Sequence, residues 1–147
     1  MVEVTGICIA REGRAVLDHV DISVSRGEIV TVVGINGAGK TSLLRAVIGS
    51  IQPDTGHIWR RPDLQIGYMP QLNALYQELS IKENVDFFAR MYGMSDRGER
   101  TEAVEDAIKL VNLWDRRKDS ILKLSGGMKQ RVSLAVALVH HPTLLLL

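Results

Sequence analysis

The residues best suited to chemistry form a glycine-rich stretch, GINGAGKT, at positions 34–41. Its glycines permit tight backbone turns and let amide N–H groups approach phosphate oxygens closely. A helix that starts there adds about half a positive charge. The lysine suits contact with β- and γ-phosphates, and the threonine hydroxyl suits Mg²⁺. We therefore predict that a nucleoside triphosphate is bound by Gly34, Asn36, Gly37, Ala38, Gly39, Lys40, Thr41 and Ser42.

A second glycine motif, LSGGMKQR at 124–131, predicts a different kind of helix start. Ser125 is a good N-cap, and Gly126 and Gly127 leave the first turn bare. Lys129 and Arg131 follow, although cations oppose the helix dipole at this end. The pattern suits an incoming anion. It equally suits an ordinary capped helix with an unfavourable surface charge pattern, and the residues alone leave both readings open.

The elements around the first motif belong to an α/β pattern. Segments rich in β-branched residues predict strands over 2–9 and 16–24, joined by the turn REGR. The continuous apolar run at 29–33 predicts a parallel strand covered on both faces. After the glycine loop we expect a helix from Lys40 to Ile48, ended by Gly49. Two short strands then follow, near 57–59 and 64–68.

The second half of the chain shows helical periodicity. SIKE forms a capping box in which Ser80 and Glu83 open one helix. A second helix is expected over roughly 99–113, and a third runs from the second glycine motif to just before Pro142. The order of elements predicts a helical lobe at 72–124 inserted into an α/β core.

Composition excludes several classes of protein. Lys and Arg number 18 against 17 for Asp and Glu, giving a net charge of +1, so a broadly basic nucleic-acid surface is not expected. No apolar run approaches the roughly 20 residues of a membrane span. The N-terminal MVEVTGICIA lacks the basic region of a secretory signal. We expect a cytosolic protein.

The cysteine and the histidines give no indication of a metal site. The single cysteine, Cys8, is expected to be a small apolar filler on a strand. The four histidines show no metal-ligand spacing, since His140 and His141 are adjacent and diverge on a helix.

Taken together, the motifs resemble those of the ATP-binding cassette (ABC) family of ATPases. GINGAGKT resembles its phosphate loop, LSGGMKQR its signature motif, and GYMPQ its Q-loop, which places the key glutamine at Gln71. The resemblance implies a P-loop NTPase (RecA-like) core with an N-terminal antiparallel β subdomain and the helical lobe. Residues 1–71 would hold the β subdomain and phosphate-loop core, and residues 125–147 the signature helix and the start of the Walker B strand.

The resemblance also implies roles and partners. Two such domains pair head to tail, so Ser125, Gly126 and Gly127 would face the γ-phosphate of an ATP held by the partner. Lys40 and Gln71 would be the catalytic residues, and Thr41 and Gln71 would contact Mg²⁺. The lobe of the family receives a short helix from a membrane permease, at the inner face of the cell membrane. The cluster Phe87, Phe88, Met91, Tyr92 and Met94 is expected to be mostly lobe core, with one or two side chains left for that groove.

The chain departs from the family pattern in two places. Ala10, Arg11 and Glu12 stand where the family usually stacks an aromatic residue on adenine, so we expect weak discrimination between ATP and GTP. The final LLLL would be the Walker B strand, which the family follows with an Asp that organises Mg²⁺ and a Glu that activates water. We therefore expect a chain without the C-terminal core strands, which alone hydrolyses ATP negligibly and is poorly soluble.

The leading hypothesis is the ATP-hydrolysing subunit of an ABC transporter. The stretches SIKENVDFFARMYGM and LSGGMKQRVSLAVALVHHP favour an exporter, whereas LQIGYMPQ also looks like metal-ion importers. The alternatives are a soluble ABC ATPase acting on ribosomes or DNA, or a nucleotide-binding remnant without catalysis. The first alternative usually carries two cassettes or long coiled-coil inserts, and neither is found in this sequence.

Overall fold

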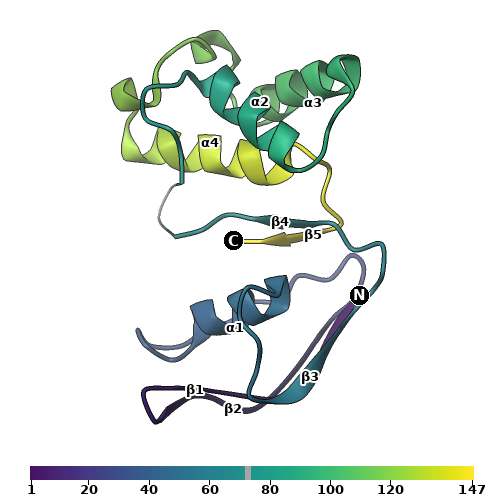
Figure 1. Cartoon of the computed structure of the whole chain (residues 1–147). Coiled ribbons are helices and arrows are strands. Elements are labelled where there is room, and N and C mark those ends of the chain that lie inside the picture. Colours follow the sequence, from purple (N-terminus) through teal and green to yellow (C-terminus); the bar gives the residue numbers. More distant parts are fainter. Residues whose placement is uncertain (72–73) are drawn as a thin grey trace. The chain divides into compact units, whose positions relative to one another are not determined.

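The computed structural model describes residues 1–71 and 74–147 and divides into two compact units, Met1–Leu64 and Gln65–Leu147. Residues 72 and 73, where the helical lobe was expected to begin, lie outside the described residues. None of the described helices is both long and apolar enough to cross a membrane. The α/β class and the N-terminal antiparallel sheet are confirmed (Figure 1).

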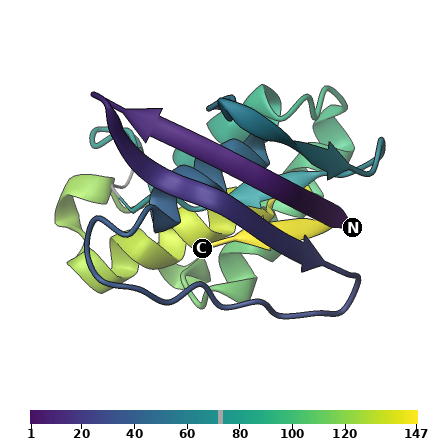
Figure 2. The same cartoon turned by 90° about the horizontal axis from the view of Figure 1, so that it is seen from below.

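The first unit is an antiparallel sheet with one helix. Strands β1 (Val2–Arg11), β2 (Arg14–Val24) and β3 (Thr55–Arg60) lie in the order β2-β1-β3 (Figure 2). Helix α1 (Lys40–Ile48) contacts β1 and β2. Alternate apolar side chains of the sheet are buried, as expected for strands with one covered face. The buried residues of this unit include Val2, Val4, Ile7, Ile9, Leu17, Leu43, Ala46 and Val47.

Two sets of hydrogen bonds stabilise the C-terminal end of α1. Gly49 adopts a left-handed φ of 91° and its N–H donates to the carbonyls of Arg45 and Ala46, which confirms the predicted helix stop. Arg60 of β3 donates from Nε to the Val47 carbonyl and from Nη2 to the Ala46 carbonyl, both at 2.6 Å. The cation thus satisfies carbonyls of the last turn, where the helix dipole favours it.

The strand predicted at 29–33 is wrong. These residues form no strand, and the side chains of Ile29 and Val33 are 93% and 87% exposed. A parallel strand requires neighbours that satisfy its backbone N–H and C=O groups. None of the described strands pairs with this run, so its apolar character alone does not make it a strand.

The second unit is mainly helical. Helices α2 (Ile81–Met91), α3 (Arg97–Leu110) and α4 (Gly126–Leu138) pack together, with short 3₁₀ turns η1 (Trp114–Arg116) and η2 (Ile121–Lys123) between the last two (Figure 1). Strand β4 (Ile66–Tyr68) pairs in parallel with β5 (Leu144–Leu146). The core confirms the predicted apolar stripes, which include Val85, Val104, Ile108, Val111, Val132, Val136 and Val139.

The capping box predicted at the start of α2 is confirmed, and a glycine of β4 is required by packing. Ser80 Oγ accepts from Glu83 N at 3.2 Å and Glu83 Oε2 accepts from Ser80 N at 2.8 Å, which completes the capping box of α2. At β4, Gly67 is required by packing, because an added Cβ would collide with the Ala137 carbonyl and lie 2.8 Å from Cγ of Pro142. The glycine therefore lets β4 approach the end of α4 closely.

Candidate functional site

The predicted phosphate loop ends in an open helix start. Gly37 and Gly39 have φ values of 84° and 87°, a region that glycine adopts without steric cost. Gly39 is the N-cap of α1, and none of the described residues closes that start with a side-chain hydrogen bond. No acidic residue stands in the first turn of α1. The first N–H groups of a helix have no partner within it, so this start suits an anion.

The two left-handed glycines are needed for different reasons. A Cβ at Gly39 would lie 2.5 Å from the Val16 carbonyl and 2.7 Å from Cδ2 of Leu17, both on β2. At Gly37 a Cβ would meet nothing within 4 Å, so only the backbone angle calls for glycine there. The loop is therefore fastened to the sheet at its helix end by close contact with β2.

Lys40 lies against the backbone of the same loop. Its Nζ donates to the carbonyl of Gly34 at 2.7 Å and to that of Ile35 at 2.9 Å. Thr41 is exposed and Ser42 half-buried on the first turn of α1. An amine, two hydroxyls, an uncapped helix start and left-handed glycines form a donor set that fits a triphosphate with Mg²⁺.

The glycines of the second motif differ from those of the first, because neither their backbone angles nor the described packing requires a glycine. Ser125 caps α4, its Oγ accepting from Met128 N at 3.3 Å. Gly126 and Gly127 have no positive φ, and a Cβ on either would meet nothing within 4 Å. Neither backbone strain nor packing within the described chain calls for glycine there. A bare and exposed helix start is what an incoming anion needs.

The two basic side chains of this motif are hydrogen-bonded to other residues of the second unit. Lys129 Nζ donates to Oε1 of Gln77 at 3.3 Å, and Arg131 Nη1 donates to the Val111 carbonyl at 3.4 Å. Their side chains therefore serve the packing of the unit. The reading of this motif as an anion site rests on Ser125 and the glycines.

Gln71 is exposed and lies in a bend shortly after β4, where Met69 N donates to the Leu146 carbonyl at 2.9 Å. It belongs to the second unit together with Ser125, whereas the phosphate loop belongs to the first. The structure brings Gly34 to Ser42 together as one local site. The joint action of Gln71 and Ser125 with that site stays a prediction.

A buried asparagine was missed by the sequence reasoning. Asn84 of α2 is fully buried, and its Oδ1 accepts from Tyr76 N at 2.9 Å. Its Nδ2 donates to the carbonyls of Tyr76 and Ser80, each at 3.0 Å. Asn84 therefore fixes the segment that precedes α2. The available signal was its place beside Val85 on the apolar stripe, where a polar residue must find partners.

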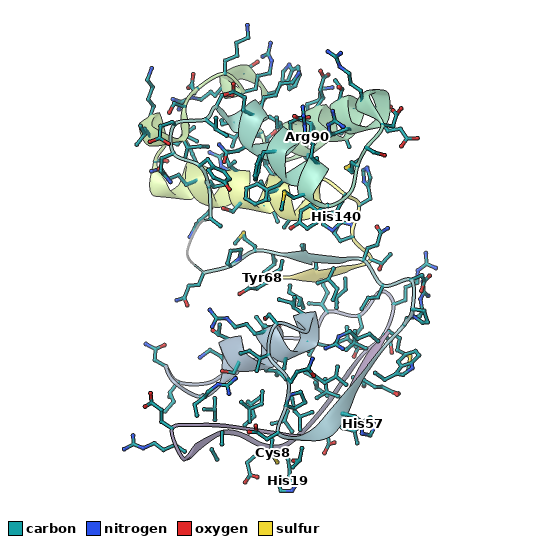
Figure 3. The ribbon with its side chains drawn as sticks, viewed as in Figure 1. Cys8, His19, His57, Tyr68, Arg90 and His140 are labelled. Carbon is teal, nitrogen blue, oxygen red and sulfur yellow. The ribbon has the colours of Figure 1, made fainter. Side chains whose placement is uncertain are left out.

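A cavity of about 480 Å³ lies between β4, the α2–α3 connection and the turn after α4. His140, which is labelled in Figure 3, lines it, and its ring stacks on that of Tyr92. Nε2 of His140 is 3.2 Å from the Ile66 carbonyl, and because a carbonyl only accepts, this nitrogen carries the proton. Nδ1 is buried with no partner among the described residues. Burial lowers the pKa of His140 and raises the pKa of Tyr92.

The predicted aromatic cluster divides between core and surface. Phe88 and Met94 pack against the core of the second unit, and Tyr76 contacts Phe87 edge-on at 4.8 Å. Met91 is 70% exposed and stands outside the core.

Comparisons with known proteins agree on one family. Residues 17–147 match the family model described as "ABC transporter". The zinc import ATP-binding protein ZnuC of Pseudomonas savastanoi pv. phaseolicola is 41% identical over all of this chain and 53% of its own length. ZnuC of Pseudomonas fluorescens (strain Pf-5) is 43% identical over 99% of this chain and 52% of its own. The chain thus spans about half the length of the curated relatives it matches.

A solved structure described as "Structure of ATP binding subunit of ABC transporter" superposes with a TM-score of 0.82 at 30% identity. The match covers 96% of this chain and 62% of that chain. The fold inferred from the motifs is therefore confirmed.

The expected preference for an exporter conflicts with these relatives, which are named for zinc import. The first stretch that favoured an exporter forms α2, since the capping box and Ile81, Val85 and Ala89 make the start and the buried face of that helix. Such features stabilise the fold, and the names of the relatives do not support the preference.

Proposed function

Because the chain belongs to the ABC transporter family, we propose that it binds MgATP at the phosphate loop and serves as the ATP-binding subunit of a zinc importer. The observation that carries nucleotide binding is the uncapped start of α1 behind two left-handed glycines, with Lys40 at hand. The cargo is proposed from the names of the relatives, which are zinc import proteins.

At the proposed site each group has one task. Backbone N–H groups of the loop and of the start of α1 hold the phosphate oxygens. Lys40 exchanges its bonds to the Gly34 and Ile35 carbonyls for the β- and γ-phosphates. Thr41 and Gln71 would ligate Mg²⁺, which neutralises charge on the phosphates when bound.

A second copy of the ATP-binding domain is proposed to complete the site. Ser125, Gly126 and Gly127 would face the γ-phosphate held by that copy. Support comes from the exposed, bare start of α4, whose glycines are required neither by their backbone angles nor by packing against the described residues. We further propose that the lobe at 72–124 binds a membrane permease and that the protein works at the cytoplasmic face.

Nucleotide binding is tested directly on the purified chain with a fluorescent ATP analogue. Lys40→Ala should weaken binding by at least about tenfold, because it removes a charge-assisted contact to phosphate. Lys118→Ala removes the same charge from an exposed position in the other unit and should bind like the wild type. Equal binding by Lys40→Ala would refute the proposed nucleotide site.

Cargo is tested in the organism that carries the gene. Deletion of the gene should lower cellular zinc and growth under chelation. The wild-type gene should restore both, and Lys40→Ala should not. Unchanged zinc with a loss of another metal, or with sensitivity to a drug, would reject zinc import while leaving the nucleotide site standing.

A further inference from the structure

The exposed face of the antiparallel sheet carries three ligand-type side chains close together. The ligand atoms of Cys8, Asp18 and His19 all lie within 4.8 Å of one another. Sγ of Cys8 is 3.9 Å from Oδ1 of Asp18, which is 2.7 Å from Nδ1 of His19. Figure 3 shows Cys8 and His19 beside each other on the first unit.

An irregularity in strand pairing creates this cluster. Ile7 pairs with Val20 and Ile9 with Leu17, so two residues of β2 stand opposite Cys8 alone. This is a β-bulge, which re-aims a side chain that would otherwise alternate. Leu17 is buried whereas Asp18 and His19 are both exposed, so consecutive residues face the same side. His19 N also donates to Sγ of Cys8 at 3.3 Å.

Cys8 faces the same side for the ordinary reason of strand alternation. Ile7 and Ile9 are buried on the covered face, so Cys8 between them points to the other. Its own surroundings are polar, with the Asp18 carboxylate and the Gly6 carbonyl near the sulfur.

The donor set selects the kind of ion. Thiolate sulfur, imidazole nitrogen and carboxylate oxygen are the three ligand types of Zn²⁺, and three protein ligands leave a fourth position for water. Mg²⁺ prefers oxygen ligands alone and is disfavoured here. The side chains of His19 and Asp18 are 80% and 77% exposed, so both can turn toward an ion without disturbing the sheet core.

We propose that Cys8, Asp18 and His19 form a binding site for a borderline-soft divalent cation, Zn²⁺ above all, on the exposed face of the N-terminal sheet. None of its residues belongs to the nucleotide site, and the proposal does not depend on the cargo of the transporter.

Cobalt provides the sharpest test, because a thiolate bound to Co²⁺ gives a near-ultraviolet charge-transfer band. Cys8 is the only cysteine, so a band can arise from no other residue. The purified chain should show one that saturates at one Co²⁺ per chain and is displaced by Zn²⁺ but not by Mg²⁺. Cys8→Ser should abolish the band, and His19→Ala should weaken Co²⁺ binding at least about tenfold. His57→Ala removes an exposed histidine of β3 and should change nothing.

A second readout needs no variant. Zn²⁺ should slow alkylation of Cys8 in the wild-type chain at least about tenfold, because the metal-bound thiolate is not a free nucleophile. Absence of both the band and the protection overturns the proposal. A band that appears only with dimerisation on gel filtration also overturns it, since the ligands would then come from two chains. Circular dichroism of each variant shows whether a lost band reflects a lost ligand or a lost fold.

Discussion

The ring of Tyr92 stacks on the imidazole of His140, with centroids 3.9 Å apart and planes inclined by 22°. Tyr92 is the C-cap of α2, and His140 lies two residues beyond the end of α4. Since His140 Nε2 also donates to the Ile66 carbonyl, one side chain links two helix ends to β4. The stability of the second unit should therefore depend on this imidazole remaining neutral.

The first prediction concerns pH. Burial lowers the pKa of His140 below its usual 6.5 in the folded chain. The unfolded chain then binds the proton more readily, so the contribution is full above pH 6.5 and is lost as pH falls through the lowered pKa. Urea unfolding from about pH 8 to about pH 5 should show falling stability, with a smaller fall in His140→Gln. Identical pH profiles for the two proteins would contradict this.

The second prediction compares two glycines. Gly67→Ala should destabilise the second unit by about 1–3 kcal/mol, because the added methyl collides with the Ala137 carbonyl. Gly126→Ala is the matched control, since its methyl meets nothing within 4 Å. Its stability should stay within about 0.5 kcal/mol of the wild type. Thermal unfolding measures both, and equal effects would show that Gly67 is not a packing requirement.

The same control variant separates folding from function. If Gly126 serves a γ-phosphate held by a second copy, Gly126→Ala should fold normally yet fail to restore zinc accumulation in the deletion strain. Full restoration would count against the proposed role of the second motif.

The third prediction concerns Asn84. Asn84→Asp keeps the size and the acceptor for Tyr76 N but turns an oxygen toward the carbonyls of Tyr76 and Ser80. The loss of donors at a buried site should cost about 2–4 kcal/mol in the free energy of unfolding. Asn112→Asp makes the same change at an exposed position and should cost little. Chemical denaturation distinguishes the two.

The fourth prediction concerns the base of the nucleotide. Arg11 is exposed at the end of β1, and its Nη1 donates to the Ala10 carbonyl at 3.4 Å. A guanidinium plane can stack on either purine, whereas nothing in this stretch reads the base edge. ATP and GTP should therefore compete for the phosphate loop within about tenfold of each other. A large preference for ATP in competition binding would be contrary to this.

Local signals in the sequence predicted most of the fold. The capping box at Ser80, the stop at Gly49 and the cap at Ser125 each depend on residues within four positions of one another. Such interactions can be read from a linear pattern. The apolar stripes of the helices were found for the same reason, since their period is fixed by helix geometry.

What the sequence did not show depends on pairing between distant segments. The run at 29–33 has the composition of a buried strand but pairs with none of the described strands. Cys8 was expected to be an apolar filler, and the histidines were judged to lack ligand spacing. Both stay predictions, but the structure places Cys8 beside Asp18 and His19 across a hairpin whose irregular register no spacing rule reveals.

His19 is the extra residue of the bulge in β2, and the sheet does not need it to keep its pairing. Removal of His19 would leave Leu17, Asp18 and Val20 opposite Ile9, Cys8 and Ile7 in regular succession, with Leu17, Ile7 and Ile9 still on the covered face. A single codon therefore distinguishes regular pairing between Ile7 and Ile9 from a bulge that gathers three ligands. In this hairpin, the pairing of the strands can therefore be kept while the ligand-type side chains on its exposed face are gained or lost.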